Sequence, residues 1–326
     1  MKKTVALLLA LLTLAAIFTG CGKQTETQQP DKLKIVATIF PEYDWAREIL
    51  GGTAENAEIT LLLDSGVDLH SYQPTVEDLV KISDCELFLY VGGESDDWVE
   101  SALETTANPN RKIINLLEIL GDAVKTEETV EGMQEDEHED HEDEPEQDEH
   151  VWLSLKNAQI LVPAICQALQ EADPGNQEAY AANTAAYLQK LSALDAAYRS
   201  VADGSTTKTI LFGGRFPFRY LADDYGLKYY AAFVGCSAET EASFETVSFL
   251  ARKVDEEGLP CVLTIEGTQH KIAETIVQNT AEKNQKVLTL DSMQSTTFKD
   301  AENGVTYLSI MEKNLAVLKE ALGQGG

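Results

Sequence analysis

The sequence predicts an α/β protein with two lobes. Each lobe is made of βα repeats around a parallel sheet, and one long linker helix joins them. Short apolar runs alternate with segments of helical periodicity in both halves of the 326-residue chain, a pattern typical of parallel sheets. Between the halves, Asn176 to Asp203 contains no proline and no glycine, which favours one helix of about 40 Å. The chain is also long enough for two domains.

The N-terminus has the features of a secretion signal. Two lysines precede an apolar run from Val5 to Phe18, which is shorter than a typical membrane-spanning helix. The small residues before Cys21 are typical of a bacterial lipobox. We therefore predict a signal peptide over residues 1–20, a lipid on Cys21 that anchors the protein to the outer face of the cell membrane, and a flexible tether over residues 21–32. The alternative is an ordinary signal peptide with an incidental cysteine.

The first lobe is predicted over residues 33–172. Its strands are short and apolar, and helices with apolar spacing alternate with them. The predicted strands are Leu33–Thr38, Ile59–Leu63, Glu86–Val91 and Lys112–Asn115. The predicted helices are Pro41–Leu50, Thr75–Ile82, Asp97–Thr105 and Leu155–Glu171.

The linker helix is predicted within residues 173–205, after the helix-breaking segment Asp173-Pro174-Gly175. The second lobe follows over residues 206–326, with the same alternation. Its predicted strands are Thr209–Phe212, Lys228–Ala232, Cys261–Ile265 and Lys286–Thr289. Its predicted helices are Phe216–Tyr225, Ser243–Glu257, Ile272–Lys283 and Gly304–Leu322.

The charge is strongly acidic and unevenly distributed. A formal net charge of −30 argues against nucleic acid as a partner, because phosphates are bound by clustered Lys and Arg. The stretch from Glu127 to Glu149 contains 14 acidic residues and no Lys or Arg. This acidic loop, residues 126–149, also carries His138 and His141, so we expect it to attract cations and to chelate them weakly. The alternative is a solvated loop without a role.

Five histidines, at positions 70, 138, 141, 150 and 270, are the main candidates for metal binding. His70 lies in a loop after a predicted strand, and His150 lies at the start of a predicted helix. Ligands of open α/β sheets bind beyond the carboxyl ends of the strands, and imidazole is the commonest metal ligand in proteins. A loop histidine is otherwise ordinary polar surface.

Three sequence segments favour a metal-binding role over ordinary polar surface for these histidines. They are DLHSYQPT (68–75), EHVWLSLKNA (149–158) and VLTLDSM (287–293). In this order, they resemble motifs of the zinc- and manganese-binding solute-binding lipoproteins of ABC importers. The resemblance extends over about residues 33–322. It implies a metal cleft between the lobes with His70, His150 and Asp291 as ligands. It also implies a monomer without catalytic activity that delivers the ion to the membrane permease of an ABC transporter.

One position departs from that family. Where the family has a third ligand, His or Glu, this chain has Arg215, and guanidinium has no lone pair to offer a metal. Three explanations remain open. In the first, water completes the coordination of the metal. In the second, another side chain replaces the missing ligand, with His270 and Glu266 as candidates. In the third, Arg215 binds a small anion or pairs with Asp291 or Glu266.

The acidic loop with its histidines favours Zn²⁺ as the ligand, although Mn²⁺ accepts the same set of donors. A zinc-dependent hydrolase with Glu266 as base is a weaker alternative, since the sequence contains no HExxH motif, nucleophile elbow or Walker loop. A role as a surface adhesin stays open. Cys85 and Cys166 lie in apolar segments and are expected to be buried, while a Cys236–Cys261 disulfide is an open alternative.

Overall fold

The structure is a computed structural model, and it describes residues 32–64, 66, 69–134, 146–237, 241–267 and 270–324. Leu33–Gly326 forms one compact unit, separate from Met1–Lys32. Among the helices of the described residues, none is both long enough and apolar enough to cross a membrane.

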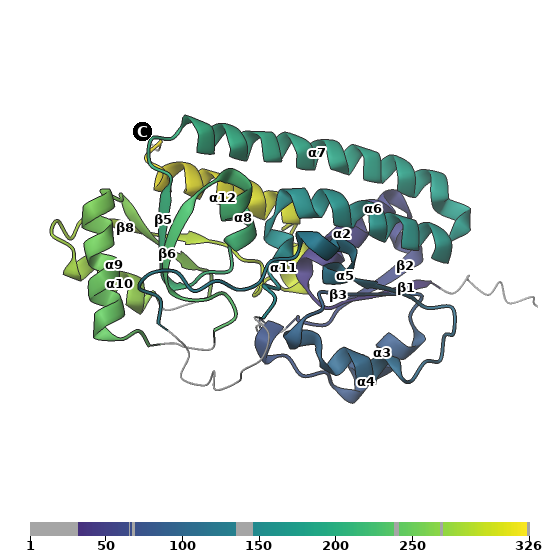
Figure 1. Cartoon of the computed structure of the whole chain (residues 1–326). Coiled ribbons are helices and arrows are strands. Elements are labelled where there is room, and N and C mark those ends of the chain that lie inside the picture. The colour runs from purple at the N-terminus through teal and green to yellow at the C-terminus, as the bar shows by residue number, and fades with distance from the viewer. Residues whose placement is uncertain are drawn as a thin grey trace, which may run out of the picture. The chain divides into compact units, whose positions relative to one another are not determined.

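The first sheet has four parallel strands in the order β2-β1-β3-β4. Most residues of its strands are apolar, as expected for a parallel sheet that helices cover (Figure 1). They are β1 (Leu33–Ala37), β2 (Ala57–Leu61), β3 (Leu87–Tyr90) and β4 (Lys112–Asn115). The helices of this half are α2 (Phe40–Leu50), α3 (Val76–Asp84), α4 (Trp98–Leu103), α5 (Leu116–Leu120) and α6 (Leu155–Ala172).

The second sheet repeats this plan with the strand order β6-β5-β7-β8. Its strands are β5 (Thr209–Arg215), β6 (Lys228–Phe233), β7 (Cys261–Ile265) and β8 (Lys286–Leu290). Its helices are α8 (Arg219–Tyr225), α9 (Phe244–Glu257), α10 (Lys271–Asn279), α11 (Phe298–Glu302) and α12 (Tyr307–Ala321).

Helix α10 lies so close to β5 that the strand needs a glycine at the contact. A Cβ on Gly213 would lie 2.5 Å from the Cα of Ala273, well inside the distance at which carbon atoms repel each other. The strand register shifts between Phe212 and Arg215, directly around this contact. Gly213 therefore lets the end of β5 pass beneath α10.

The long helix α7 (Gln177–Gly204) connects the two halves. It packs against α2 and α6 of the first half and against α8 and α12 of the second (Figure 1). Its buried residues recur every three or four positions, which places them on one face. They are Tyr180, Thr184, Tyr187, Leu191, Leu194, Tyr198 and Ala202.

Buried hydrogen bonds also join the two halves directly. The indole Nε1 of Trp152 donates to the carbonyl of Ser292 at 2.9 Å, and the hydroxyl of Tyr307 donates to the carbonyl of Trp152 at 2.7 Å. The backbone N–H of Tyr307 donates to Asp44 in α2 at 2.7 Å. Trp152, Tyr307 and Asp44 are all buried, so water does not compete for these bonds, and they fix the two sheets relative to each other.

A buried carboxyl, Glu42, closes the first turn of α2. Its Oε2 accepts hydrogen bonds from the backbone N–H and the hydroxyl of Thr38, at 2.9 and 3.1 Å, and from the backbone N–H of Ile39 at 3.3 Å. Glu42 is fully buried. Burial, together with the nearby charge of Asp96, raises the pKa of Glu42 to about 8. Glu42 is therefore mostly protonated at neutral pH.

The predicted fold class is confirmed, and the differences lie at the ends of elements and in two five-residue helices, α5 and α11, that the sequence did not predict. The helix predicted from Phe216 begins only at Arg219, because Pro217 disfavours helical geometry at the residue before it. The helix predicted over Gly304–Leu322 begins at Tyr307. The short α11 just before it was not predicted.

Candidate metal centre

His70 lies in a short 3₁₀ turn, Leu69–Ser71, between β2 and α3. Its neighbour Leu69 is buried in the core and holds the turn against the sheet. The Nδ1 of His70 lies 2.7 Å from the hydroxyl oxygen of Ser95 and 3.4 Å from the Oε2 of Glu149. With Nδ1 engaged by these oxygens, Nε2 is the ring nitrogen available to a metal.

His150 lies just before a second 3₁₀ turn, Val151–Leu153, which leads into α6. The ring is fully buried. Asp148 fixes it twice, because its Oδ1 lies 3.0 Å from the ring Nδ1 and accepts the backbone N–H of His150 at 2.9 Å. Burial is the largest influence on the pKa of His150 and lowers it, but the hydrogen bond and charge of Asp148, with the charges of Glu127 and Glu149, raise it overall. A carboxylate behind the imidazole is the usual arrangement behind a metal-binding histidine.

The Nε2 atoms of His70 and His150 face each other at 3.3 Å. In the metal-free protein this distance lets one ring donate a hydrogen bond to the other. In a tetrahedral zinc site with Zn–N bonds of about 2.0–2.1 Å, two ligand nitrogens also lie about 3.3–3.4 Å apart. The two rings therefore already have the spacing that one zinc ion requires.

A third ligand atom lies beside these rings, on Cys236. In the part of the chain that the structure describes, one group of histidine, cysteine and carboxylate ligands gathers closely enough to hold a metal ion. It consists of His70, His150 and Cys236, whose ligand atoms all lie within 4.8 Å of one another. Cys236 follows β6, so it extends the site from the first half of the protein to the second.

Sequence reasoning missed Cys236 as a candidate ligand. It considered this residue only for a bridge to Cys261, but both are free thiols in the structure, and Cys261 is buried in β7. One signal was available, since Cys236 follows a strand of the second sheet at its carboxyl end, where ligands of such sheets bind. The expected burial of Cys85 and Cys166 is confirmed.

The three acidic or imidazole candidates of the second half do not belong to this close group of described residues. Asp291 directly follows β8, and its Oδ1 accepts the backbone N–H of Met293 at 2.8 Å. Burial, and next the charge of Glu266, raise the pKa of Asp291 to about 6. Among the described residues, neither Asp291 nor Glu266 nor His270 belongs to the group formed by His70, His150 and Cys236.

Glu266 is engaged by the segment that follows Asp291. Its two carboxylate oxygens accept the backbone N–H and the hydroxyl of Ser292, at 2.6 and 2.8 Å, and the backbone N–H of Gln294 at 3.1 Å. His270 precedes α10 with a left-handed backbone, φ 54°. His138, His141 and Cys21 lie outside the described residues.

Arg215 contacts the turn that carries Cys236. Its Nη1 donates to the carbonyl oxygen of Ser237 at 3.4 Å. Glu127 approaches the same turn, since its Oε1 accepts the backbone N–H of Cys236 at 2.9 Å. Burial raises the pKa of the Cys236 thiol well above its ordinary value, and the charges of Glu127, Glu149 and Asp148 raise it further.

The carboxylates around this group make it suitable for a dication. Asp148 and Glu149 are nearly fully buried, and Glu127 is partly buried. The Oε1 of Glu149 accepts the backbone N–H of Ser95 at 2.8 Å, and its Oε2 lies buried 3.4 Å from the Nδ1 of His70 without a hydrogen bond. Buried anionic groups without cationic partners are costly, and a bound dication offsets that cost.

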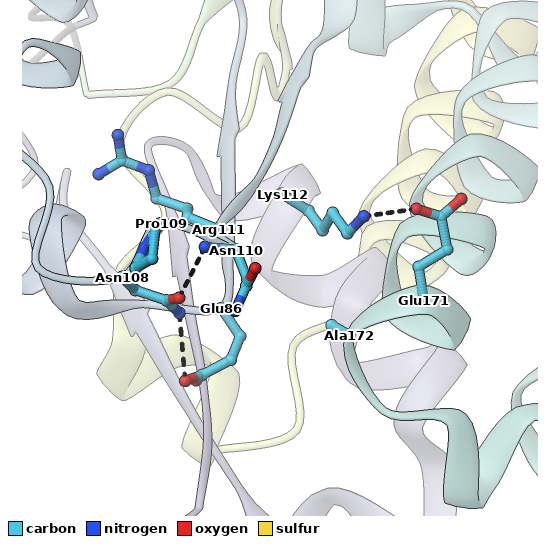
Figure 2. Close-up of a pocket in the computed structure, with 8 residues that line it drawn as sticks. All are labelled: Glu86, Asn108, Pro109, Asn110, Arg111, Lys112, Glu171 and Ala172. Carbon is cyan, nitrogen blue, oxygen red and sulfur yellow. Dashed lines mark hydrogen bonds and ion pairs between the residues drawn. The ribbon is translucent and has the colours of Figure 1, made fainter.

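A pocket lined by polar residues lies at the other edge of the first sheet, where β3 and β4 begin. Figure 2 shows the ion pair of Lys112 with Glu171, at 2.7 Å, and Asn108 beside Glu86. No His or Cys lines it. His70 follows the carboxyl end of β2, so this pocket is separate from the metal-binding group.

Two parallel-sheet lobes, joined by a long helix and carrying two facing imidazoles, define the class of two-lobed metal-binding solute-binding proteins. A family model described as ZnuA, the periplasmic component A of a zinc-uptake complex, matches residues 35–321. The chain belongs to this ZnuA family, which confirms the resemblance stated from the three sequence motifs.

Curated relatives of the chain carry names that refer to zinc binding or zinc uptake. The chain is 32% identical to the zinc-binding lipoprotein AdcA of Streptococcus pneumoniae, over 99% of this chain and 62% of the relative. It therefore spans less than two thirds of that relative's length. It is 31% identical to the high-affinity zinc uptake system protein ZnuA of Bacillus subtilis, over 96% of this chain and 97% of the relative. The Zn(II)-bound ZnuA-like domain of S. pneumoniae AdcA, 30% identical, covers 90% of this chain and aligns over its own full length with a TM-score of 0.69.

Proposed function

We propose that this protein captures Zn²⁺ outside the cytoplasm and delivers it to the membrane permease of an ABC importer, without catalysing a reaction. The observation that supports zinc capture is the 3.3 Å separation of the two imidazole Nε2 atoms, with each Nδ1 held by oxygen atoms. The zinc-binding relatives support the choice of ion. A lipid on Cys21 would keep the protein at the membrane surface beside the permease.

In this proposal His70 and His150 bind the ion, and Asp291 supplies an acidic ligand from the second half. Burial and the charge of Glu266 raise the pKa of Asp291, so a cation nearby would stabilise its carboxylate form. Because Asp291 lies outside the group of ligand atoms within 4.8 Å of one another, its approach to the ion would need the site to tighten when the metal binds.

Calorimetry on the metal-stripped full-length chain tests the proposal. We expect one Zn²⁺ per chain, and a loss of at least about tenfold in affinity for His70→Ala and for His150→Ala. His270→Asn is a matched control, because asparagine tolerates the left-handed backbone at that position. Absence of zinc binding by the unaltered chain would refute the proposal, and tighter binding of Mn²⁺ than of Zn²⁺ would refute the choice of ion.

The acidic loop has a separate role in this proposal. His138 and His141 would hold zinc weakly and pass it to the tighter site. Deleting residues 135–145 should then slow zinc uptake at low metal concentration and leave the affinity of the tight site unchanged. Stopped-flow measurement of the association rate separates the two effects, and an unchanged rate would contradict a role for this loop.

A further inference from the structure

We propose that the thiolate of Cys236 is a direct ligand of the bound ion, so that the site is built from two imidazoles and one sulfur. This inference rests on the proposed function and makes it more specific, since it names a ligand supplied by the second half of the protein. The observation behind it is the gathering of the Cys236 Sγ with a ligand nitrogen of His70 and of His150 within 4.8 Å.

The distances suit zinc. With Zn–S bonds of about 2.3 Å and Zn–N bonds of about 2.0–2.1 Å, sulfur and nitrogen ligands of a tetrahedral site lie about 3.6 Å apart. The observed limit of 4.8 Å exceeds this value by little more than 1 Å. A small movement of the turn that carries Cys236 therefore brings all three donors into bonding distance, while the two rings keep their spacing.

The local backbone is built for this approach. A Cβ on Gly235 would lie 3.0 Å from the Cε1 of His150 and 3.1 Å from the carbonyl oxygen of Phe216, so a glycine lets the turn pack directly against the imidazole. Arg215, which cannot itself bind a cation, donates to the carbonyl of Ser237 on the other side of the cysteine. The residue at the family's third ligand position thus holds the turn that presents the sulfur.

Binding of Zn²⁺ to the Cys236 thiol requires only the loss of its proton. When Zn²⁺ binds, the S–H bond of Cys236 breaks, an S–Zn bond forms with the sulfur electron pair, and the proton leaves to solvent. The carboxylate of Glu127, which accepts the backbone N–H of Cys236 at 2.9 Å, can take up that proton on its way out. One coordination position is left for an oxygen donor.

A sulfur ligand has a consequence for selectivity. Thiolate binds zinc and other borderline or soft ions much better than manganese, which prefers oxygen donors. Cys236 would therefore set the preference for Zn²⁺ over Mn²⁺, which two histidines and a carboxylate do not provide. The expected effect of Cys236→Ser is a loss of at least about tenfold in zinc affinity, with a much smaller change for Mn²⁺.

X-ray absorption at the zinc edge of the unaltered, zinc-loaded chain tests the ligand directly. We expect one sulfur scatterer at about 2.3 Å and nitrogen or oxygen at about 2.0–2.1 Å. In Co²⁺-loaded protein, an intense sulfur-to-cobalt charge-transfer band should appear in the near ultraviolet. Both signals should disappear in Cys236→Ser and persist in Cys166→Ser, the matched control with a thiol in α6 outside the site.

The outcomes separate the two proposals. If the chain binds one zinc through His70 and His150 but shows no sulfur scattering, the ligand role of Cys236 is overturned and the proposed function stands. If the unaltered chain binds no zinc, both fall. If Cys236→Ser does not fold, alkylation of the unaltered chain decides: protection of Cys236 by zinc supports ligation, and equal labelling with and without zinc refutes it.

Discussion

Asp148 offers the sharpest test of how the metal centre is held in place. One oxygen, Oδ1, accepts from the backbone N–H of His150 and lies 3.0 Å from its ring Nδ1. In Asp148→Asn an amide oxygen can occupy the same position, so both contacts are retained and only the negative charge is lost. Loss of such a partner behind a metal-binding histidine costs about 10–100-fold in metal affinity, or about 1.4–2.8 kcal/mol. We therefore expect weaker zinc binding with nearly unchanged stability of the metal-free protein.

Asp148→Ala should behave differently. It removes both contacts and leaves the buried backbone N–H of His150 without its acceptor, which adds a cost of about 1–3 kcal/mol to folding. Competition with a zinc chelator measures the affinities, and urea unfolding of the metal-free chain measures the stabilities. Asp122→Asn, at an exposed position, is the control. Zinc affinity of Asp148→Asn equal to that of the unaltered chain would show that the carboxylate does not support the metal-binding ring.

The remaining predictions concern stability and can be measured by urea unfolding. Folding raises the pKa of Glu42 from 4.5 to about 8, so the folded state binds the proton more tightly than the unfolded state. The free energy of unfolding should therefore fall between about pH 5 and pH 8, by as much as about 5 kcal/mol. Glu42→Gln should weaken that decline, and an equally steep pH profile in the variant would contradict this reasoning. Gly213→Ala places a methyl group 2.5 Å from the Cα of Ala273 and should cost about 1–3 kcal/mol; an unchanged midpoint would mean that α10 moves away freely. Trp152→Phe removes the hydrogen bond to Ser292 and should cost about 1 kcal/mol or somewhat more, whereas a stability loss within error would show that water replaces the bond.

Much of the fold could be predicted because buried parallel strands are rich in apolar residues, and each of the eight strands in the described part of the chain coincides with a predicted one. The helix α7 could be predicted because its sequence lacks breakers over many turns. The five-residue α11 could not, since a helix of this length shows too little periodicity. The start of α8 differs from the helical periodicity because Pro217 restricts the backbone of Phe216.

The candidate metal centre could also be predicted only in part from the sequence. His70 and His150 each stand in a recognisable local segment, so their candidacy could be read from neighbouring residues. The position of Cys236 depends on the turn after β6 approaching a ring from the other half of the protein, and no local pattern encodes that contact. The sequence shows that Arg215 replaces a family ligand. It does not show that Cys236, whose turn Arg215 contacts, approaches the two imidazoles.

The buried hydrogen bonds of Trp152, Tyr307 and Asp44 have a mechanical consequence. A protein that opens about a flexible hinge exchanges its cargo by swinging whole lobes apart. Here, separating the two halves would break several buried hydrogen bonds at once and bend a 28-residue helix. This motion is therefore energetically costly. The short turn that carries His70 and the turn that carries Cys236 take no part in these bonds. If the protein releases zinc as proposed, we therefore expect these two turns to move while the two halves keep their positions.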